Sequence, residues 1–188
     1  LLRKVLAAGH LSVLEHASFT FGVSGISRAC SHPLVRHRIA SFSQQSQRYV
    51  DASGFDAVIP PAIAANGEAL RRFNALLEEA RTVYAELLAM GIASEDARFV
   101  LPNAVKTSLA VTMNARELRH FFSLRCCLRA QWEIRELAGK MLALVREKAP
   151  LLFAGVGPAC LSGPCPEGGK SCGRMEDVRA AFAAGTIP

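Results

Sequence analysis

The strongest constraint on the fold is a change of hydrophobic period that occurs at residue 114. From Val105 to Met113, larger side chains stand at the odd positions and smaller or more polar ones at the even positions, as in a half-buried strand. Asn114 then has the form of a helix N-cap, with the acidic Glu117 at the third helical position. We therefore predict a strand that runs directly into a helix, whose free backbone N–H groups would favour an anion.

Helical periods dominate the rest of the chain. The longest helix is predicted from a cap at Asn66 to Met90, with an apolar stripe at helical spacing and Gly91 as its stop. Shorter helices are predicted over residues 1–8, 26–35, 94–101, 130–148 and 175–184, and from a capping box at 12–15.

A second strand is predicted over residues 17–23, where apolar and polar side chains alternate, and a turn at Ser24 and Gly25 should end it. Residues 56–59 are predicted as a short extended piece before two prolines. Together with a length of 188 residues, these elements indicate the α+β class. We predict a single domain in which long helices flank a mixed or antiparallel sheet.

An unusually basic stretch covers residues 36–48. It holds three Arg, one His, three Ser and three Gln, and no Asp or Glu occurs between Glu15 and Asp51. Arg is permanently charged and presents a planar fork of donors that fits two phosphate oxygens, while Ser and Gln can satisfy the remaining oxygens. We predict a loop that binds an anion; a solvated basic surface loop is the alternative.

The net charge of +6 points to anionic partners, which could be nucleic acid, an acidic membrane face or phosphorylated small molecules. One Trp and two Tyr offer few rings for stacking on bases, so pockets explain the charge better than a nucleic-acid surface. No apolar run approaches the roughly 20 residues that cross a bilayer. We expect a soluble, cytoplasmic protein with neither nucleic acid nor membrane as partner.

The spacing of residues 36–48 resembles the signature of the flavin-dependent thymidylate synthases, through Arg36, His37, Arg38, Ser41, Ser46 and Arg48. The stretches 10–50, 98–102 and 113–137 also resemble that family, so the likeness covers most of the chain. The resemblance implies methylation of dUMP to dTMP, with methylenetetrahydrofolate as carbon donor, NADPH as electron source and FAD as hydride carrier. It also implies a homotetramer whose sites combine residues from more than one subunit.

Positions that match the family's motifs give the expected site residues. The FAD-binding residues implied by the resemblance are His10, Ser12, Arg36, His37, Arg38, Gln44, Asn114, Arg116 and His120. Those implied for dUMP are Pro33, Leu34, Val35, Arg36, Gln44, Gln45, Ser46, Gln47, Arg48, Arg98 and Arg125. Arg125 is expected to act in catalysis, because a fixed cation beside the uracil ring would stabilise the enolate-like form that attacks. Ser46 is interpreted as a binding hydroxyl, since no His and acid pair is placed to activate it.

The end of the chain, residues 151–188, is rich in Gly, Pro and Cys and is predicted as an extension of a catalytic domain formed by residues 1–150. Its cysteines could hold a metal or remain thiols, together with two more cysteines of the catalytic domain. A structural zinc or an iron–sulfur cluster usually includes a Cys-x-x-Cys pair, which is absent, so thiols are favoured and no metal site is assigned. The cysteines concerned are Cys126, Cys127, Cys160, Cys165 and Cys172.

Three alternatives stay open. His10, Glu15 and His16 could bind zinc, although their spacing is not that of a known ligand set. The basic stretch could belong to a nucleic-acid-binding module, which would bind DNA or RNA with a steep salt dependence. The protein could also be another flavoenzyme that acts on a nucleotide without forming dTMP.

Overall fold

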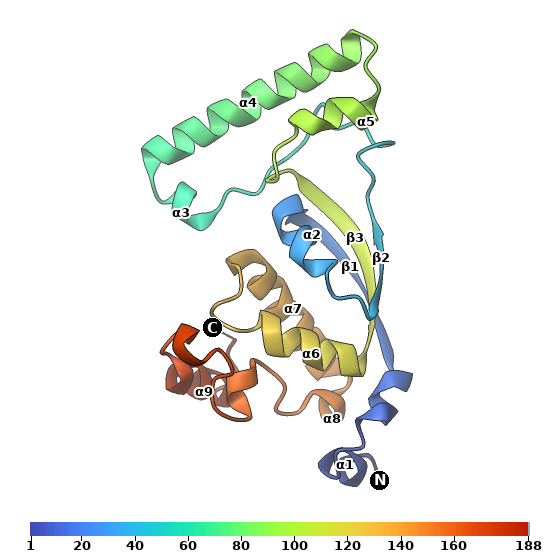
Figure 1. Cartoon of the computed structure of the whole chain (residues 1–188), viewed down its shortest axis with the longest axis vertical. Helices are drawn as coiled ribbons and strands as arrows, with labels where there is room; N and C mark the ends of the chain where they lie inside the picture. The colour runs from blue at the N-terminus through green and yellow to red at the C-terminus, as the bar shows by residue number, and fades with distance from the viewer. Residues whose placement is uncertain (188) are drawn as a thin grey trace. The chain divides into compact units, whose positions relative to one another are not determined.

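The computed structural model describes residues 1–187, and its contacts divide the chain into two compact units (Figure 1). Unit 1 comprises Leu1–Phe21, Pro33–Ser41 and the residues from Val111 onward, and unit 2 comprises Gly22–His32 and Phe42–Ala110. The division falls within each of three strands, which are β1 (Ser18–Ser27), β2 (Ala40–Gln44) and β3 (Lys106–Asn114). These strands form an antiparallel sheet in the order β1-β3-β2, and the predicted α+β class is confirmed.

Strand β3 runs straight into α6 (Ala115–Arg125), as the change of period predicts. Thr107, Leu109, Val111 and Met113 are buried along the strand, which confirms the alternation. The Asn114 side chain accepts a hydrogen bond from the backbone N–H of Glu117 at 2.9 Å, so the predicted cap of the helix is present.

Strand β1 passes through the turn predicted at Ser24 and Gly25, and that prediction is wrong. Beyond this point the segment just before β3 still supplies a backbone partner, because the N–H of Arg28 donates to the carbonyl of Val105 at 3.0 Å. Gly25 takes a φ of +74°, which glycine adopts without a steric cost, so the strand bends without ending. Pairing across the sheet overrides the local preference for a turn.

The basic stretch 36–48 is also more regular than predicted, because β2 occupies its middle. The strand continues into Gln45, whose N–H donates to the carbonyl of Ser108 on β3 at 2.9 Å. The helix predicted before this stretch is α2 (Arg28–Leu34), which starts two residues later than expected since β1 is longer. Sheet pairing therefore fixes the direction of side chains that a loop would leave variable.

The predicted capping box near the N-terminus is not formed. Residues Leu11–His16 form a 3₁₀ helix, η1. Its N-cap residue is His10, and no side chain makes a capping hydrogen bond there. The Glu15 carboxylate pairs instead with the guanidinium of Arg116. The carboxylate that a capping box would have used is therefore engaged in an ion pair with α6 (Ala115–Arg125).

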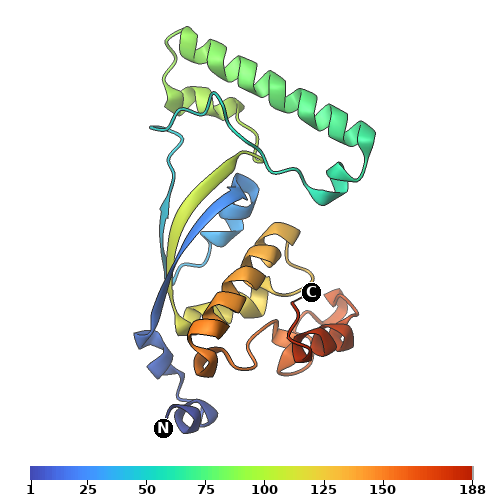
Figure 2. The ribbon, with the colours of Figure 1, turned by 180° about the vertical axis from the view of Figure 1, so that it is seen from behind.

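Apart from α1 (Leu2–Ala7), the remaining helices of unit 1 lie in the second half of the chain. Rings of Phe121, Phe122 and Phe153 make edge-to-face contacts in the core, with centroids 5.5 and 6.1 Å apart. Helices α6 and α7 lie side by side in both views (Figure 1, Figure 2). The remaining elements of this unit are α1 (Leu2–Ala7), α7 (Trp132–Lys148), α8 (Pro150–Phe153), η3 (Ala159–Leu161), η4 (Gly168–Lys170) and α9 (Met175–Ala183).

Unit 2 is built around the long helix α4 (Gly67–Ala89), which packs Leu77 and Ala80 against Phe55 and Val105. Its predicted limits are confirmed, because Asn66 caps its start and Gly91 follows it with a φ of +83°. The unit also contains α3 (Pro61–Ala64), α5 (Ser94–Ala97) and η2 (Arg98–Val100). Within residues 1–187, no helix combines the length and apolar character needed to cross a membrane.

Replacing Asn66 with alanine should lower the free energy of unfolding by about 1 kcal/mol, because its side chain accepts from the N–H of Ala69 at 3.0 Å. For a chain of this size the melting temperature should fall by about 2–4 °C. Asn74→Ala, in the exposed middle of the same helix, is the matched control and should be neutral or slightly stabilising. Equal melting temperatures for Asn66→Ala and the unmodified protein would contradict the role of this cap.

Candidate active site

A line of three hydrogen-bonded side chains lies within unit 1. The Nδ1 atom of His37 is 3.0 Å from the Oε1 of Glu117, and the Nε–H of Arg125 donates to the Nε2 of His37 at 3.0 Å. A longer bond of 3.4 Å runs from Nη2 of Arg125 to the carbonyl of Pro33. His37 and Glu117 are each only 6% exposed, so this arrangement lies inside the protein.

The geometry fixes the protonation of His37. Because the arginine is permanently charged, the Nε2 atom that faces it must accept, and the imidazole proton then lies on Nδ1 and donates to Glu117. Burial lowers the pKa of His37, and the Arg125 charge acts in the same direction, against the hydrogen bond to Glu117, which raises it. A neutral His37 therefore links the carboxylate to the guanidinium at neutral pH.

Lowering the pH should destabilise the fold through His37. Its pKa in the folded state lies below the usual 6.5, so its contribution is present above that pH and is lost as the pH falls below 6.5 toward the folded value. The slope should reach at most about 1.4 kcal/mol per pH unit. Urea unfolding at several values between pH 7.5 and 5 measures it, with His37→Gln as reference. The pH dependence should be weaker in His37→Gln, and identical slopes would contradict the assignment.

Helix α6 positions two of these groups. Glu117 is in its first turn and Arg125 is its last residue, while His37 comes from the segment between α2 and β2. The sequence predicted His37 and Arg125 as site residues, but it gave Glu117 only as part of a helix start. The one signal in the sequence was its place in the first turn of that helix; its contact with a histidine of the basic stretch is visible only in the fold.

Arg36 and Arg38 differ from His37 in exposure. His37 points into the protein, whereas both arginines are exposed, and none of the ion pairs found in residues 1–187 involves them. His120 is also exposed, with its ring 6.1 Å from that of His37. This donor set, cationic or neutral and without a carboxylate partner, suits an anion such as the diphosphate of a dinucleotide.

The other predicted residues of unit 1 are placed in several ways. His10, Ser12 and Val35 are exposed near η1 and the end of α2, and Arg116 is held by Glu15. The side chain of Leu34 is fully buried, so only its backbone could contact a ligand. Asn114 already accepts the backbone N–H of Glu117, which leaves its amide nitrogen as the group that could serve a ligand.

Predicted residues of unit 2 form a separate polar cluster. Glu95 joins two of them: its carboxylate lies 2.6 Å from Arg48, and its carbonyl accepts from the Nε of Arg98 at 2.9 Å. The amide nitrogen of Gln44 donates to the hydroxyls of Ser31 and Thr107 at 3.0 and 3.3 Å. These contacts hold two arginines and a carboxamide in fixed positions around the basic stretch.

Sequence reasoning missed Arg28 in this unit. Its Nη2 donates to the carbonyl of Gln45 at 2.7 Å, and its Nε is buried without a hydrogen-bond partner among residues 1–187. Burial and then the charge of Arg98 lower the pKa of Arg28. Arg28 also lines a cavity of about 180 Å³ together with Gln45, Ser46 and Gln47. Arg28 brings positive charge to this cavity, whose other charged lining residues are Lys106, Asp51 and Asp56.

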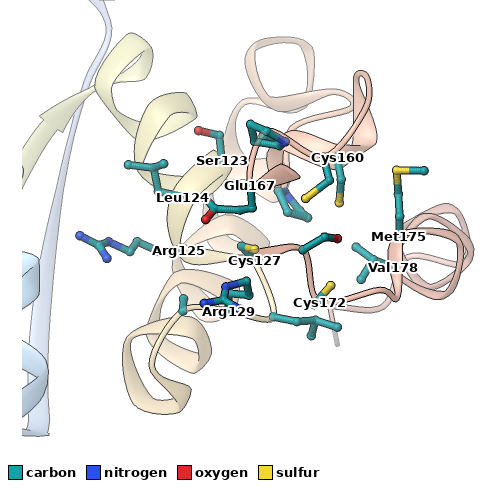
Figure 3. A pocket seen from close by; sticks show the side chains of 17 residues that line it. Ser123, Leu124, Arg125, Cys127, Arg129, Cys160, Glu167, Cys172, Met175 and Val178 are labelled. Atoms are coloured by element: carbon teal, nitrogen blue, oxygen red, sulfur yellow. The ribbon is translucent and has the colours of Figure 1, made fainter. Parts of the chain in front are cut away.

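A second cavity, of about 320 Å³, lies in unit 1 beyond α6 (Figure 3). Four cysteines line it: Cys127, Cys160, Cys165 and Cys172. Burial first, and then the other three thiols, raise the pKa of Cys160, so its sulfur lies within electrostatic range of each of the other three. Cys126 does not line the cavity; its burial raises its pKa to about 12 and keeps it a thiol at neutral pH.

Comparison with known proteins identifies the family. The profile of the family described as "Thymidylate synthase complementing protein" matches residues 1–151. A flavin-dependent thymidylate synthase of Geobacter sulfurreducens is 57% identical over 183 residues, which cover 96% of this chain and 79% of that protein. Enzymes of the same name from Nitratidesulfovibrio vulgaris and Pyrococcus furiosus are 54% and 49% identical, covering 92% and 88% of this chain and 75% and 72% of theirs. The resemblance read from the basic stretch is thereby confirmed, and the chain belongs to the flavin-dependent thymidylate synthase family.

Proposed function

We propose that this protein methylates dUMP to dTMP, with methylenetetrahydrofolate as the carbon donor, NADPH as the reductant and FAD as the bound flavin. Membership of the family supports thymidylate synthesis with a flavin. The observation that carries the proposal for this chain's own residues is the hydrogen-bonded line from Glu117 through His37 to Arg125. It orients a permanent cation through a buried, neutral imidazole, which is held in turn by the Glu117 carboxylate.

Arg125 is proposed to activate the pyrimidine. Carbon 5 of uracil becomes nucleophilic only when electron density moves into the ring, and negative charge then grows on O4. A guanidinium held at that position stabilises the charge without giving up its proton, since Arg stays protonated in proteins. His37 and the Pro33 carbonyl accept from it and so restrict its rotation. Little reorganisation is then needed when the charge develops.

The flavin site is proposed to include the exposed donors of unit 1. Arg36, Arg38 and His120 are suited to phosphate oxygens, and Arg116 stands at the start of α6, where backbone N–H groups also favour anions. His10 and Ser12 are proposed to contact the same cofactor, in line with the resemblance. When bound, the flavin supplies the hydride that completes the methyl group.

The phosphate and sugar of dUMP are proposed to bind residues of the unit 2 cluster. Ser46, Arg48 and Arg98 provide a hydroxyl and two cations, and the carboxamides of Gln44, Gln45 and Gln47 add neutral donors. Arg28 is proposed to reinforce the charge of this cluster from its buried position. A homotetramer in the cytoplasm, with sites built from several subunits, remains part of the proposal by family resemblance.

No thiolate nucleophile is included in this mechanism. Cys126 is one residue from Arg125, but its raised pKa, about 12, leaves almost none of it ionised at neutral pH. Cys127, the next residue, lines the cavity beyond α6 rather than contacting His37 or Pro33. The residues near Arg125 therefore support a route in which the nucleotide ring is activated by charge alone.

The test is formation of dTMP from dUMP, methylenetetrahydrofolate and NADPH by the purified protein with FAD. Bound flavin that has been reduced should be reoxidised when dUMP and methylenetetrahydrofolate are added together. Flavin binding without dTMP formation would favour another flavoenzyme acting on nucleotides. A colourless protein that does not take up FAD and binds DNA with a steep salt dependence would favour a nucleic-acid-binding module.

A further inference from the structure

The four thiols around the cavity of about 320 Å³ in unit 1 have no role in the proposed reaction. Three of them belong to the segment between α8 and α9, where Cys160 is in η3 and Cys165 and Cys172 follow in irregular backbone. The fourth, Cys127, lies between α6 and α7, two residues after Arg125. The fold therefore brings together thiols that are up to 45 residues apart in the sequence, counting from Cys127 to Cys172.

The side chains converge on one space. Figure 3 shows Cys127, Cys160 and Cys172 around the cavity, while Arg125 points away from it. The guanidinium of Arg125 is engaged with His37 and the Pro33 carbonyl on the other side. Cys160 is 8% exposed and the other three thiols are half-buried, so the cavity is sheltered but can be reached from solvent.

The rest of the lining suits a compact anionic group in a largely apolar setting. Apolar contacts come from side chains of both segments, and the charged groups at the cavity besides Arg125 are Arg129 and Glu167. An iron–sulfur cluster bound by four thiolates is itself anionic overall and is sensitive to local charge and to burial. The apolar lining residues are Leu124, Leu128, Ala130, Pro158, Ala159, Pro166, Met175 and Val178.

A single metal ion does not fit the arrangement. Within residues 1–187, no three side chains of His, Cys, Asp or Glu come together closely enough to hold one ion, as a tetrahedral zinc would need. An iron–sulfur cluster has no such requirement, because its thiolates are distributed over two or more iron atoms. The cavity that the four thiols line offers the space for such a cluster.

We propose that Cys127, Cys160, Cys165 and Cys172 bind an iron–sulfur cluster in this cavity. Each thiol loses its proton as its sulfur bonds to iron. The iron and sulfide come from outside the chain, and the ferric share of the iron is supplied as such, so no further oxidant is needed. The absence of a Cys-x-x-Cys pair, which argued against a metal in the sequence, is offset by a ligand that comes from a distant segment. Such a cluster would join the Cys-rich segment to the end of α6, the helix that carries Arg125.

The test measures iron and acid-labile sulfide in the protein, purified without oxygen and then incubated with ferric iron, ferrous iron and sulfide. Both assays are independent of flavin absorbance. Two or four iron atoms per chain, with an equal amount of sulfide, are expected. Cys160→Ser and Cys172→Ser should each lose most of this iron, whereas Cys126→Ala, which removes a thiol outside the cavity, should retain it. One zinc per chain in place of iron, or no metal, would overturn the proposal.

A thiol count on the unmodified protein decides the matter if the serine variants fail to fold. With the cluster bound, the four cavity thiols should be protected from a disulfide reagent under non-denaturing conditions and should become reactive after the cluster is removed. An electron paramagnetic resonance signal of the reduced protein, absent from Cys160→Ser, gives an independent readout. Iron that persists in both serine variants would show that other residues hold it and would overturn the assignment.

Discussion

Arg125→Ala should lower kcat for dTMP formation by about 10²–10³-fold, the usual effect of removing one group that stabilises developing charge. The physical reason is that the variant removes the cation while leaving Glu117 and His37 hydrogen-bonded to each other. Flavin content should be unchanged, because the proposed flavin contacts lie on other residues. Initial rates of dTMP formation and the flavin absorbance of the purified variant measure the two quantities.

Two further variants make this result interpretable. Arg125→Lys keeps a positive charge but loses the planar fork and the Nε–H that binds His37, so its activity should stay well below that of the unmodified enzyme. Arg72→Ala removes an exposed arginine of α4 whose ion pair with Glu68 is on the surface, and its activity should be unchanged. If Arg125→Ala stayed within threefold of the unmodified enzyme, charge placement by this residue would be excluded as the main catalytic effect.

Glu117→Gln should lower kcat by about 10–100-fold, as is common for groups that orient a functional side chain from behind. Glutamine has nearly the same shape, but its amide can donate to Nδ1 of His37. The imidazole proton would then move to Nε2, the atom that must accept from Arg125. The cation loses its fixed orientation, although the fold keeps its packing. Steady-state kinetics over pH 5–9 provide the measurement.

A double-mutant cycle separates positioning from a structural role. In the Arg125→Ala background, Glu117→Gln should have little further effect on kcat, because the group that it orients is absent. The pH profile should also change, since the carboxylate that favours a proton on Nδ1 of His37 is gone. If the two substitutions multiplied independently, Glu117 would be acting through stability alone.

The sequence was sufficient where local pattern and tertiary contact agree. The strand ending at Asn114, its cap and the long helix after Asn66 were predicted within one or two residues, because period and capping both depend on neighbours in the chain. The bend at Gly25 and the strand β2 were not predicted. Both depend on hydrogen bonds to β3 and to the residue before it, 77 residues beyond Arg28 and 63 beyond Gln45, which no local window contains.

The residues of the candidate site also divide into those that the sequence identified and those that only the fold revealed. The basic stretch pointed to an anion and to the family through residue types and offsets, so His37 and Arg125 were named in advance. Glu117 and Arg28 were not, because their importance depends on what they meet in space: a buried imidazole in one case and a carbonyl beside a second cation in the other. Likewise, four thiols around one cavity could not be counted as a group before the fold joined Cys127 to the C-terminal segment.

Helix α6 sets the spacing between the acid and the cation of the active site. Glu117 and Arg125 are eight positions apart, which is just over two turns of an α-helix and places both on the side that faces His37. Insertion or deletion of one residue between them would rotate one end by about 100° and shift it by about 1.5 Å. Changes of length should therefore be poorly tolerated in this helix, whereas changes of side chain that keep the register can be absorbed.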